Sequence, residues 1–433
     1  MGFRDYLKQL EERGDLVRVG KATSKIYQIA GVMQELQPTP VLFTNVREVD
    51  YQVAGNLFSS KAVIADYFGI AVTDIIPFLS RAIDQRSKPE VVNHAPCQEF
   101  VVTDPDLNQI PILRHLESDG GNYITSGVFV ARHPEYGQNL DFHRCMQFSA
   151  QDMAVRVVKG RHFDQFLEEL GQVDVAICVG NSPNVLVAGA ISVDLGVDEL
   201  EIANAMQPLQ VVRGQTVDLF IPAEAEFVIE GTVYRDRRHA EGPFVDLTET
   251  HDVIRQEPVF QVKAITHRQD AIWHALLPGG LEHKLLMGMP REPVIFKHVN
   301  QVVECLDVNV NPGGCSWLHA IVQIRKQSDD DGRKAIQAAF AGHRSGKHVY
   351  VVDEDIDIYD PLCVEWAMAT RFQGDRDLHI YERERGSSLD PSAELGTHLT
   401  TKIGFDLTKP LGEEAKHYEK VAFPEVNVDD FLA

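Results

Sequence analysis

The opening segment has the hydrophobic pattern of an amphipathic helix. Four apolar side chains recur at positions i, i+3, i+4 and i+7 and form one stripe: Phe3, Tyr6, Leu7 and Leu10. Gly14 then provides a stop. Short strands are predicted over residues 16–19 and 41–46. Helical segments interrupted at Pro77 are predicted over 64–83. Because these helices and strands follow one another, residues 1–110 are predicted to form an N-terminal α/β domain.

The middle of the chain is dominated by strand patterns. Runs rich in β-branched residues predict strands over 154–158, 173–179, 227–234 and 259–266. Two helices interrupt them, over residues 163–170 and 198–206. Mostly antiparallel strands with few helices favour a barrel or a sandwich over a doubly wound sheet. We assign residues 111–304 to this second domain.

From about residue 305 the strand and helix patterns alternate. Strands are predicted over 317–324 and 348–352, and helices over 332–341 and 361–372. Such alternation is typical of a smaller α/β domain, which we assign to residues 305–433. The acidic residues from Gly412 onward are expected to form an extended tail. The fold class is therefore predicted as α+β, with three domains.

The charge balance restricts the classes of partner. Among 433 residues, 41 are Lys or Arg and 64 are Asp or Glu, so the formal net charge is −23. Such a field repels nucleic-acid phosphates and anionic lipid, and the sequence has no dense basic stretch that would overcome it. We expect no nucleic-acid partner and no membrane partner. An anionic substrate would require a site that is locally positive.

The cysteines and the start of the chain indicate a reduced, cytoplasmic protein. Six cysteines are dispersed without any C-x-x-C pair, which argues against zinc ribbons and iron–sulfur clusters. The first residues do not resemble a signal peptide, and no run reaches the ~18 apolar residues that span a bilayer. The G-x-G-x-x-G, Walker A, G-x-S-x-G and H-E-x-x-H motifs are also absent, which disfavours the corresponding enzyme classes.

A Gly-Pro turn between two acids is the most unusual segment. Glu241-Gly242-Pro243-Phe244-Val245-Asp246 places two carboxylates five positions apart around a rigid turn. A rigid turn can hold one carboxylate at a fixed angle to a ligand, as general acid–base catalysis requires. The alternative is a loop with two solvated acids.

A second segment, Asn139 to Arg144, contains an arginine on a predicted strand. If Arg144 points inward it needs a carboxylate partner, and Glu241 and Asp246 are candidates. The alternative is a surface arginine. Asn139, His162 and Glu199 together offer an amide oxygen, an imidazole and a carboxylate, a set suited to Mn²⁺ or Mg²⁺. Their spacing forms no local motif, so a surface or capping His162 remains the alternative.

Taken together, these segments resemble the UbiD family of decarboxylases, which use prenylated FMN. The family's E-G-P-F-x-[DE] turn corresponds to residues 241–246, and its N-x-x-x-x-R segment corresponds to 139–144. Residues 221–231 resemble the strand that leads into the turn, and 353–360 resemble the family's acidic signature. The likeness covers nearly the whole chain, with the motifs in the family's order. It implies that the central domain is a split β-barrel that binds the flavin.

The resemblance also implies roles for these residues. Glu241 would donate or accept the proton at the reacting carbon, Arg144 would bind the substrate carboxylate and the flavin edge, and Asp246 would orient Arg144. The implied ligands of Mn²⁺ or Mg²⁺ are Asn139, His162 and Glu199. The implied contacts to the cofactor are these three residues together with Arg144, Arg161 and Lys334. A K⁺ ion would lie near main-chain oxygens around Ala188 and Gly189. A flavin prenyltransferase would supply the cofactor, and the C-terminal domain would form a homodimer or hexamer.

The substrate is expected to be an aromatic, heteroaromatic or α,β-unsaturated carboxylic acid, in a reversible decarboxylation. Family members that act on five-membered ring acids carry a histidine, and furandicarboxylate enzymes an arginine, in the region of His283 and Arg291. His283 is therefore expected to bind the ring, and Arg291 a second carboxylate. Alternatively, Arg291 pairs with Glu282 or Glu292 at the surface. Two other functions stay open: a flavin oxidoreductase on a related split barrel and a non-catalytic scaffold.

Overall fold

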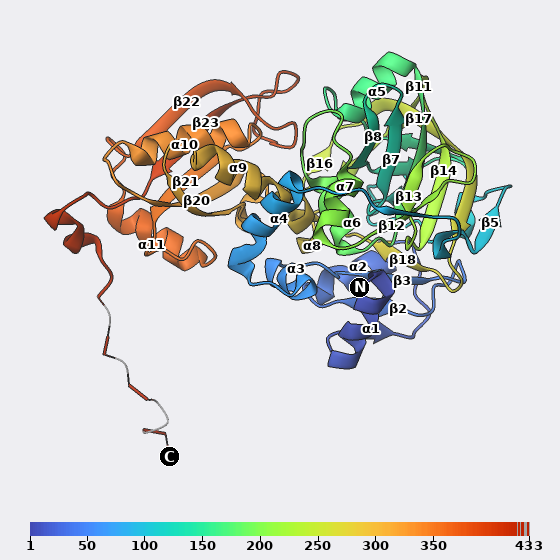
Figure 1. Ribbon diagram of the computed structural model, residues 1–433, viewed down its shortest axis with the longest axis horizontal. Helices are drawn as coiled ribbons and strands as arrows, with labels where there is room; N and C mark the ends of the chain where they lie inside the picture. The colour runs from blue at the N-terminus through green and yellow to red at the C-terminus, as the bar shows by residue number, and fades with distance from the viewer. Residues whose placement is uncertain (422, 425, 428–430, 433) are drawn as a thin grey trace.

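The computed structural model describes residues 1–421, 423–424, 426–427 and 431–432. Figure 1 shows three regions: small N-terminal elements, a large curled central sheet, and a C-terminal sheet with its helices. This arrangement confirms the predicted α+β class. The expected acidic tail begins with a short 3₁₀ helix, η6 (Glu413–Tyr418), and its described residues then extend away from the body. The remainder of that prediction lies outside the described residues.

The N-terminal region combines four helices with a four-stranded sheet. Its helices are α1 (Phe3–Arg13), α2 (Gln28–Leu36), α3 (Lys61–Phe68) and α4 (Ile75–Asp84). Its strands are β1 (Val17–Val19), β2 (Val41–Phe43), β3 (Gln52–Gly55) and β18 (Ile272–Ala275), in that order across the sheet. As predicted, the apolar stripe of α1 is buried and Gly14 ends the helix with a φ of 79°. Because β18 follows the last strand of the central sheet in the sequence, this N-terminal sheet joins distant parts of the chain.

Pro77 does not interrupt the helical segment where the sequence predicted it to. The break lies earlier, where Gly69 ends α3 with a φ of 67°. Pro77 is the third residue of α4, in the first turn. Proline is tolerated there because the N–H groups of that turn have no partner within the helix. The stretch thus contains two helices that meet at an angle of 82°. No single helix among the described residues is long and apolar enough to span a membrane, and this bent pair meets that test by length and composition only.

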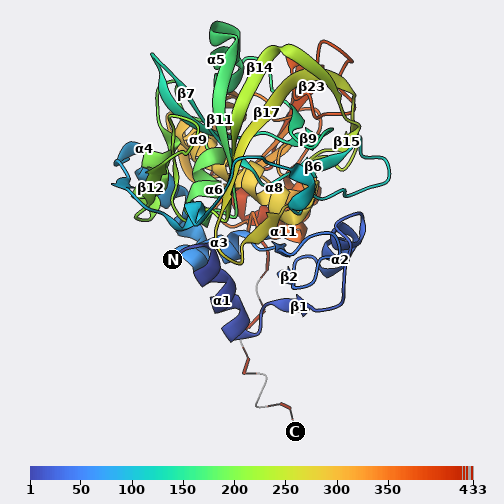
Figure 2. The same cartoon turned by 90° about the vertical axis from the view of Figure 1, so that its right-hand side faces the viewer.

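A large, mostly antiparallel sheet forms the central region. Its strand order is β6 (Asn122–Ile124), β9 (Cys145–Gln147), β10 (Asp152–Val155), β17 (Arg255–His267), β14 (Phe227–Glu241), β11 (Gln172–Val179), β7 (Val128–His133) and β8 (Gly137–Phe142). A ninth strand, β5 (Phe100–Val102), pairs with β17. Figure 2 shows β14 and β17 curving over the sheet, and register shifts interrupt their pairing at two places.

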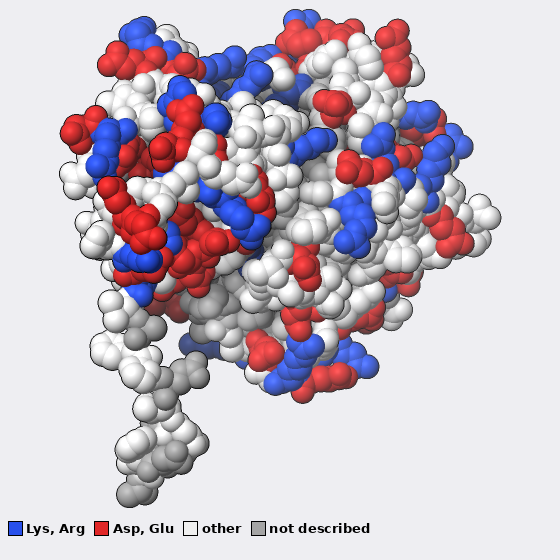
Figure 3. Space-filling view, turned by 60° about the vertical axis from the view of Figure 1, so that its left-hand side comes forward, with Lys and Arg blue, Asp and Glu red and all other residues white. Residues whose placement is uncertain are grey.

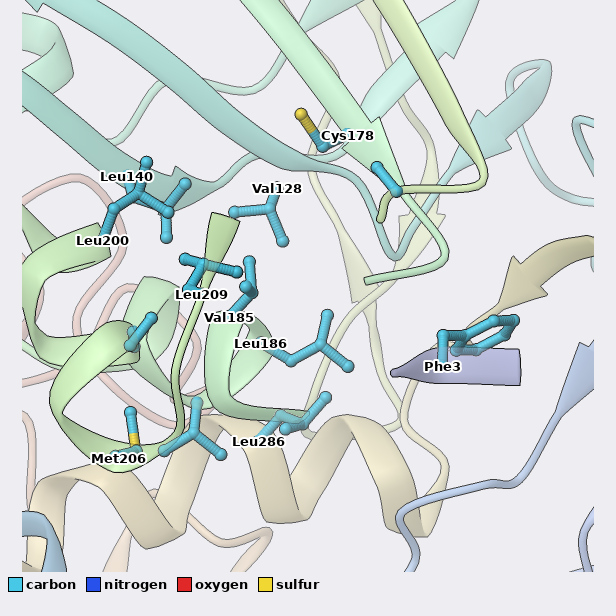
Figure 4. Close-up of a cluster of buried hydrophobic side chains, with 14 of the residues drawn as sticks. Phe3, Val128, Leu140, Cys178, Val185, Leu186, Leu200, Met206, Leu209 and Leu286 are labelled. Carbon is cyan, nitrogen blue, oxygen red and sulfur yellow. The ribbon is translucent and has the colours of Figure 1, made fainter. Parts of the chain in front are cut away.

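Helix α6 (Pro183–Ala190) is buried along its whole length. Residues on it, including Val185 and Leu186, pack against Val128 and Leu140 of the sheet on one side. Leu286 of α8 (Leu281–Gly288) belongs to the same cluster, as Figure 4 shows. An all-round apolar helix is expected at such an enclosed position. Three further strands, β4 (Glu90–Val92), β12 (Gln210–Arg213) and β13 (Phe220–Pro222), form a small separate sheet.

The C-terminal region is a five-stranded mixed sheet with helices. Its strand order is β19 (Glu304–Asn309), β20 (His319–Arg325), β21 (His348–Asp353), β23 (Leu399–Asp406) and β22 (Leu378–Arg385). Its helices are α9 (Glu292–Val299), α10 (Asp331–Gly342) and α11 (Pro361–Arg371). The alternating strands and helices predicted for this region are present. Figure 3 shows that one face of the molecule carries acidic side chains interspersed with basic ones.

Candidate active site

The link between β8 and β9 places Arg144 at the centre of the site. Only two residues, His143 and Arg144, separate these strands, and the N–H of Arg156 donates to the Arg144 carbonyl at 3.1 Å. Strand β14 ends at Glu241, beside Arg144. The next residue has a φ of 101°, which glycine adopts without strain, so Gly242 allows the chain to turn sharply there.

A two-stranded ribbon after this turn carries three more residues of the site. Strand β15 (Phe244–Val245) pairs with β16 (His251–Asp252), with Phe244 opposite Asp252. Asp246 follows β15 directly. The ribbon therefore brings Phe244, Asp246 and Asp252 to the same side of Arg144, whose guanidinium carbon lies 4.8 Å from the centre of the Phe244 ring.

Three carboxylates surround the guanidinium of Arg144. Its Nε and Nη2 donate to the two Glu241 oxygens at 2.9 and 3.2 Å. Its Nη1 donates to Asp246 at 2.5 Å, and Nη2 also donates to Asp252 at 2.8 Å. Burial opposes the charge of Arg144, but the attraction of Glu241, Asp246 and Asp252 raises its pKa. The structure thus brings together the arginine and the two acids that the sequence singled out, and adds Asp252.

The two predicted acids differ in their access to solvent. The Glu241 side chain is fully enclosed, whereas Asp246 is 18% exposed. Tyr123 is also buried and donates from its hydroxyl to Glu241 Oε1 at 3.1 Å. Burial and the neighbouring Glu241 raise the pKa of Tyr123, so its hydroxyl stays protonated and able to donate. Glu241 is therefore held behind Arg144, while Asp246 lies on the accessible side.

A cavity of about 340 Å³ opens beside Arg144, between the central and C-terminal regions. This volume is within the range of small-molecule sites. Residues that line it include Asn139, Asp141, His143, Arg144, Arg161, His162, Gly189, Ser192, Glu199, Phe244, Asp246, Asp252, His283, Arg291, Trp317 and Leu389. Glu241 is not among the lining residues.

Asn139, His162 and Glu199 meet at one wall of this cavity. Asn139 is on β8, while His162 and Glu199 are the first residues of α5 (His162–Leu170) and α7 (Glu199–Met206). Asn139 Oδ1 lies 3.1 Å from His162 Nδ1, and Glu199 accepts the Leu140 N–H at 2.7 Å. Burial raises the pKa of Glu199 well above its usual range and lowers that of His162. Among the described residues, Glu199 has no cationic partner.

These three residues fit a divalent cation. Glu199 is 3% exposed, and a buried carboxylate without a cation is unfavourable. A hard cation would be bound by the amide oxygen, the imidazole and the carboxylate. No cluster of three His, Cys, Asp or Glu side chains within the described part of the chain has metal-binding geometry. The mixed set of Asn139, His162 and Glu199 is the candidate metal site because its three oxygen and nitrogen ligands meet at one wall of the cavity.

Two arginines lie near each other at another part of the cavity. Arg291 is the last residue of η4 (Met289–Arg291), and its Nη1 donates to Ser192 Oγ. Arg161, which precedes α5, lies 3.5 Å from the same hydroxyl. Burial and the nearby Arg161 charge lower the pKa of Arg291. The Arg291 guanidinium carbon also lies 5.2 Å from the centre of the Trp317 ring. Two adjacent guanidiniums that have no acidic partner in the described part of the chain are suited to binding an anion.

The structure disfavours the alternative of a simple surface ion pair for Arg291. Glu292 instead contacts Lys61 at 2.7 Å, and Glu282 contacts His274 at 2.8 Å. His283 lines the cavity as expected, and its Nδ1 accepts the Gly279 N–H at 3.1 Å.

Two predicted site residues do not line the cavity: Glu241, which contacts Arg144 from behind it, and Lys334, which lies away from it. Lys334 lies on the half-buried face of α10, and its Nζ contacts Asp331 at 3.2 Å. Ordinary helix pairing at i, i+3 accounts for that position.

Two residues of the site were missed in the sequence. Tyr123 and Asp252 touch Glu241 and Arg144, but neither forms a recognisable spacing with its partner. Their proximity depends on the pairing of β6 with β9 and of β15 with β16. The only sequence signal for Asp252 is that it is an acidic residue shortly after the turn at residues 241–246.

Comparison with protein families gives three consecutive matches. Residues 7–83, 90–281 and 284–407 match the N-terminal, Rift-related and C-terminal domains of 3-octaprenyl-4-hydroxybenzoate carboxy-lyase, UbiD. Among curated relatives, an anhydromevalonate phosphate decarboxylase of Methanothermobacter thermautotrophicus is 40% identical and covers 98% of this chain and 100% of its own. That of Methanocaldococcus jannaschii is 38% identical over 97% of this chain and 100% of its own.

Solved structures agree with these matches. The UbiD-class enzyme HmfF from Pelotomaculum thermopropionicum, in complex with FMN, is 34% identical with a TM-score of 0.96, and both chains are covered completely. An evolved dimeric form of HmfF, in complex with prenylated FMN, has a TM-score of 0.91 at 33% identity over the full length of both chains. The 3,4-dihydroxybenzoic acid decarboxylase of Klebsiella pneumoniae has a TM-score of 0.92 at 26% identity, covering 99% of this chain and 98% of its own. The chain therefore belongs to the UbiD family of prenylated-FMN-dependent decarboxylases, and it is a carboxy-lyase.

Proposed function

We propose that the cavity binds prenylated FMN together with an unsaturated carboxylic acid that carries a second anionic group. The observation that carries this proposal is Arg144, held by three carboxylates at one wall of the cavity, together with Arg161 and Arg291, which lie elsewhere along it and have no acidic partner among the described residues. Anhydromevalonate phosphate is the first candidate substrate, because two of the relatives are named as decarboxylases of this phosphorylated acid. A furandicarboxylate is the second, favoured by the positions of His283 and Arg291.

Arg144 would hold the carboxylate that is lost as CO₂. Loss of CO₂ leaves an electron pair on carbon, and this carbon must then take a proton. Asp246 is the acid of the pair that faces the cavity, so the geometry favours Asp246 for this proton transfer. Glu241 was the proton donor implied by the family resemblance, but in this arrangement it clamps Arg144 through two hydrogen bonds. Tyr123 would in turn hold Glu241 in place.

Asn139, His162 and Glu199 would hold Mn²⁺ or Mg²⁺, and the cation would neutralise cofactor phosphate. The main chain near Ala188 and Gly189 would hold K⁺; Gly189 lines the cavity. When bound, prenylated FMN supplies the electron sink that an unsaturated acid lacks. The protein would position the acid by binding both ends, Arg144 at the reacting carboxylate and Arg161 with Arg291 at the second anion.

The test is a preparation of the full-length protein made with and without a flavin prenyltransferase. We expect a prenylated-flavin spectrum, bound Mn²⁺ or Mg²⁺, and CO₂ release from anhydromevalonate phosphate or furan-2,5-dicarboxylate. Incubating the products with bicarbonate tests the reverse direction, and light scattering tests the expected homodimer or hexamer. Ordinary FMN with hydride transfer to or from nicotinamide would contradict the proposal, as would a protein that binds no flavin.

Asp246→Asn and Glu241→Gln separate the roles of the two acids. If Asp246 transfers the proton, Asp246→Asn should lower kcat by about 100-fold or more, since general acids contribute about 10²–10⁴-fold. Glu241→Gln keeps an acceptor for Arg144 Nε and should leave more activity. Deuterium exchange into the product at the leaving position gives the same comparison without CO₂ release. A larger loss in Glu241→Gln would restore Glu241 as the proton donor.

A further inference from the structure

The hydrogen bonds of Arg144 leave it little capacity for a substrate. An arginine side chain has five N–H donors, one on Nε and two on each Nη. The Nε donor and one Nη2 donor contact Glu241, the other Nη2 donor contacts Asp252, and one Nη1 donor contacts Asp246. Among the described residues, only the second N–H of Nη1 has no partner. A substrate carboxylate that finds Arg144 in this state can accept a single hydrogen bond from it.

Asp252 is the carboxylate that removes the other possibility. Without it, one N–H on Nη2 would be free as well as the one on Nη1, and a carboxylate could accept from both nitrogens. We propose that Asp252 is a positioning residue that restricts Arg144 to one free N–H, so that a substrate carboxylate binds at Nη1 alone, beside Asp246. This inference rests on the proposed function, in which Arg144 holds the reacting carboxylate.

The surroundings of Asp252 keep it in this position. Its side chain is 8% exposed, and Arg255 Nη1 contacts it at 2.6 Å while Arg156 Nε lies 3.9 Å away. Its other oxygen accepts the Val253 N–H at 2.9 Å. Burial raises the pKa of Asp252, but the bond from Arg255 and the attraction of Arg144 and Arg255 outweigh it, and the pKa is lowered. Asp252 is therefore ionised and fixed, unlike a group that would yield to a substrate.

Asp246 has none of these extra cationic partners. Its second oxygen accepts only the N–H of Leu247, at 2.7 Å, in the described part of the chain. The Arg144 nitrogen that donates to Asp246, Nη1, also carries the free N–H. A carboxylate bound at Nη1 therefore comes to lie next to Asp246, which places the reacting end of the acid beside the group favoured for proton transfer. Asp252 would thus determine where the acid binds without touching it.

The test uses Asp252→Ala, which removes the carboxylate that accepts from Arg144 Nη2. The holoenzyme is titrated with furan-2-carboxylate by calorimetry and assayed with anhydromevalonate phosphate. We expect Kd for furan-2-carboxylate and KM to fall by about threefold or more, because a second donor is freed, while kcat falls by about tenfold or more, because the acid is misplaced. A merely structural role would lower the active fraction and leave KM and Kd unchanged, and that result would overturn the proposal.

Two further measurements make the outcome unambiguous. Asp353→Ala is the matched control, because Asp353 pairs with the enclosed Arg371 at 3.1 Å, away from the cavity, and it should leave Kd unchanged. A crystal structure of the wild-type holoenzyme with furan-2-carboxylate should show an N–H···O contact from Nη1 and none from Nη2. A bidentate contact would refute the role of Asp252, even if the variant does not fold. Both binding measurements are independent of turnover, so an enzyme that releases no CO₂ from either candidate acid would fail the proposed function but not this inference.

Discussion

Replacing Arg291 with alanine tests whether the substrate has a second anionic group. Within the described residues, Arg291 uses only Nη1 for a hydrogen bond, to Ser192, and its Nε is enclosed without a partner. A bound phosphate or carboxylate would satisfy these donors, and the Trp317 ring would keep the guanidinium oriented. Because Arg161 lies beside it, an anion there also relieves the repulsion between the two positive charges.

The magnitude follows from the number of donors. A charge-assisted hydrogen bond contributes about 1.5 kcal/mol at the lower end of its range, so two such bonds contribute about 3 kcal/mol. Arg291→Ala should then reduce kcat/KM by about 150-fold for an acid with the second anion. For an acid without it, the same variant should lose less than about fivefold, since it removes no contact to that substrate.

Anhydromevalonate phosphate and its dephosphorylated form provide a matched pair of substrates, with furan-2,5-dicarboxylate and furan-2-carboxylate as a second pair. The holoenzyme and the variant are compared by CO₂ release at equal flavin content. Arg291→Lys is the control for charge, and it should recover part of the loss on the phosphate, because lysine binds phosphate as a point charge. Equal losses on both members of each pair would refute the reasoning, since the anion would then make no contact with Arg291.

Two other predictions concern the metal and the pH dependence of stability. Glu199→Gln should lower the Mn²⁺ content of purified holoenzyme by about tenfold or more by metal analysis, and unchanged content would exclude Glu199 as a ligand. Burial lowers the pKa of His343 to about 4, so the unfolded chain binds a proton at a higher pH than the folded chain. Stability should therefore fall by up to about 3 kcal/mol as the pH drops from about 6.5 to 4. Urea unfolding across this range should show the loss, and His343→Gln should show a smaller one.

The sequence predicted the parts of the fold whose signals are local. The helical stripe of α1, its glycine stop and the long strands β11 and β17 have clear periodicity, so the pattern and the structure agree on where they lie. The position of the break between α3 and α4 was wrong, because a proline in a first helical turn reads like a helix breaker. Composition alone does not distinguish the two cases.

The candidate site was predictable where a motif carried it. Glu241 and Asp246 share one turn, and Arg144 closes a short segment, so the resemblance to a family located all three. Asp252 depends on the pairing of β15 with β16, which no spacing in the chain records. Lys334 shows the opposite case: the family resemblance implied that it contacts the cofactor, but in the structure its side chain contacts Asp331.

The placement of β18 beside β3 has a consequence for biosynthesis. The nascent chain leaves the ribosome from its N-terminus, so β1, β2 and β3 emerge long before the strand that completes their sheet. Until residues 272–275 have been translated, the edge of β3 is open and its backbone groups are free to pair with other chains. Fragments truncated before β18 should therefore aggregate, and a chaperone that shields this edge during translation would increase the yield of folded enzyme.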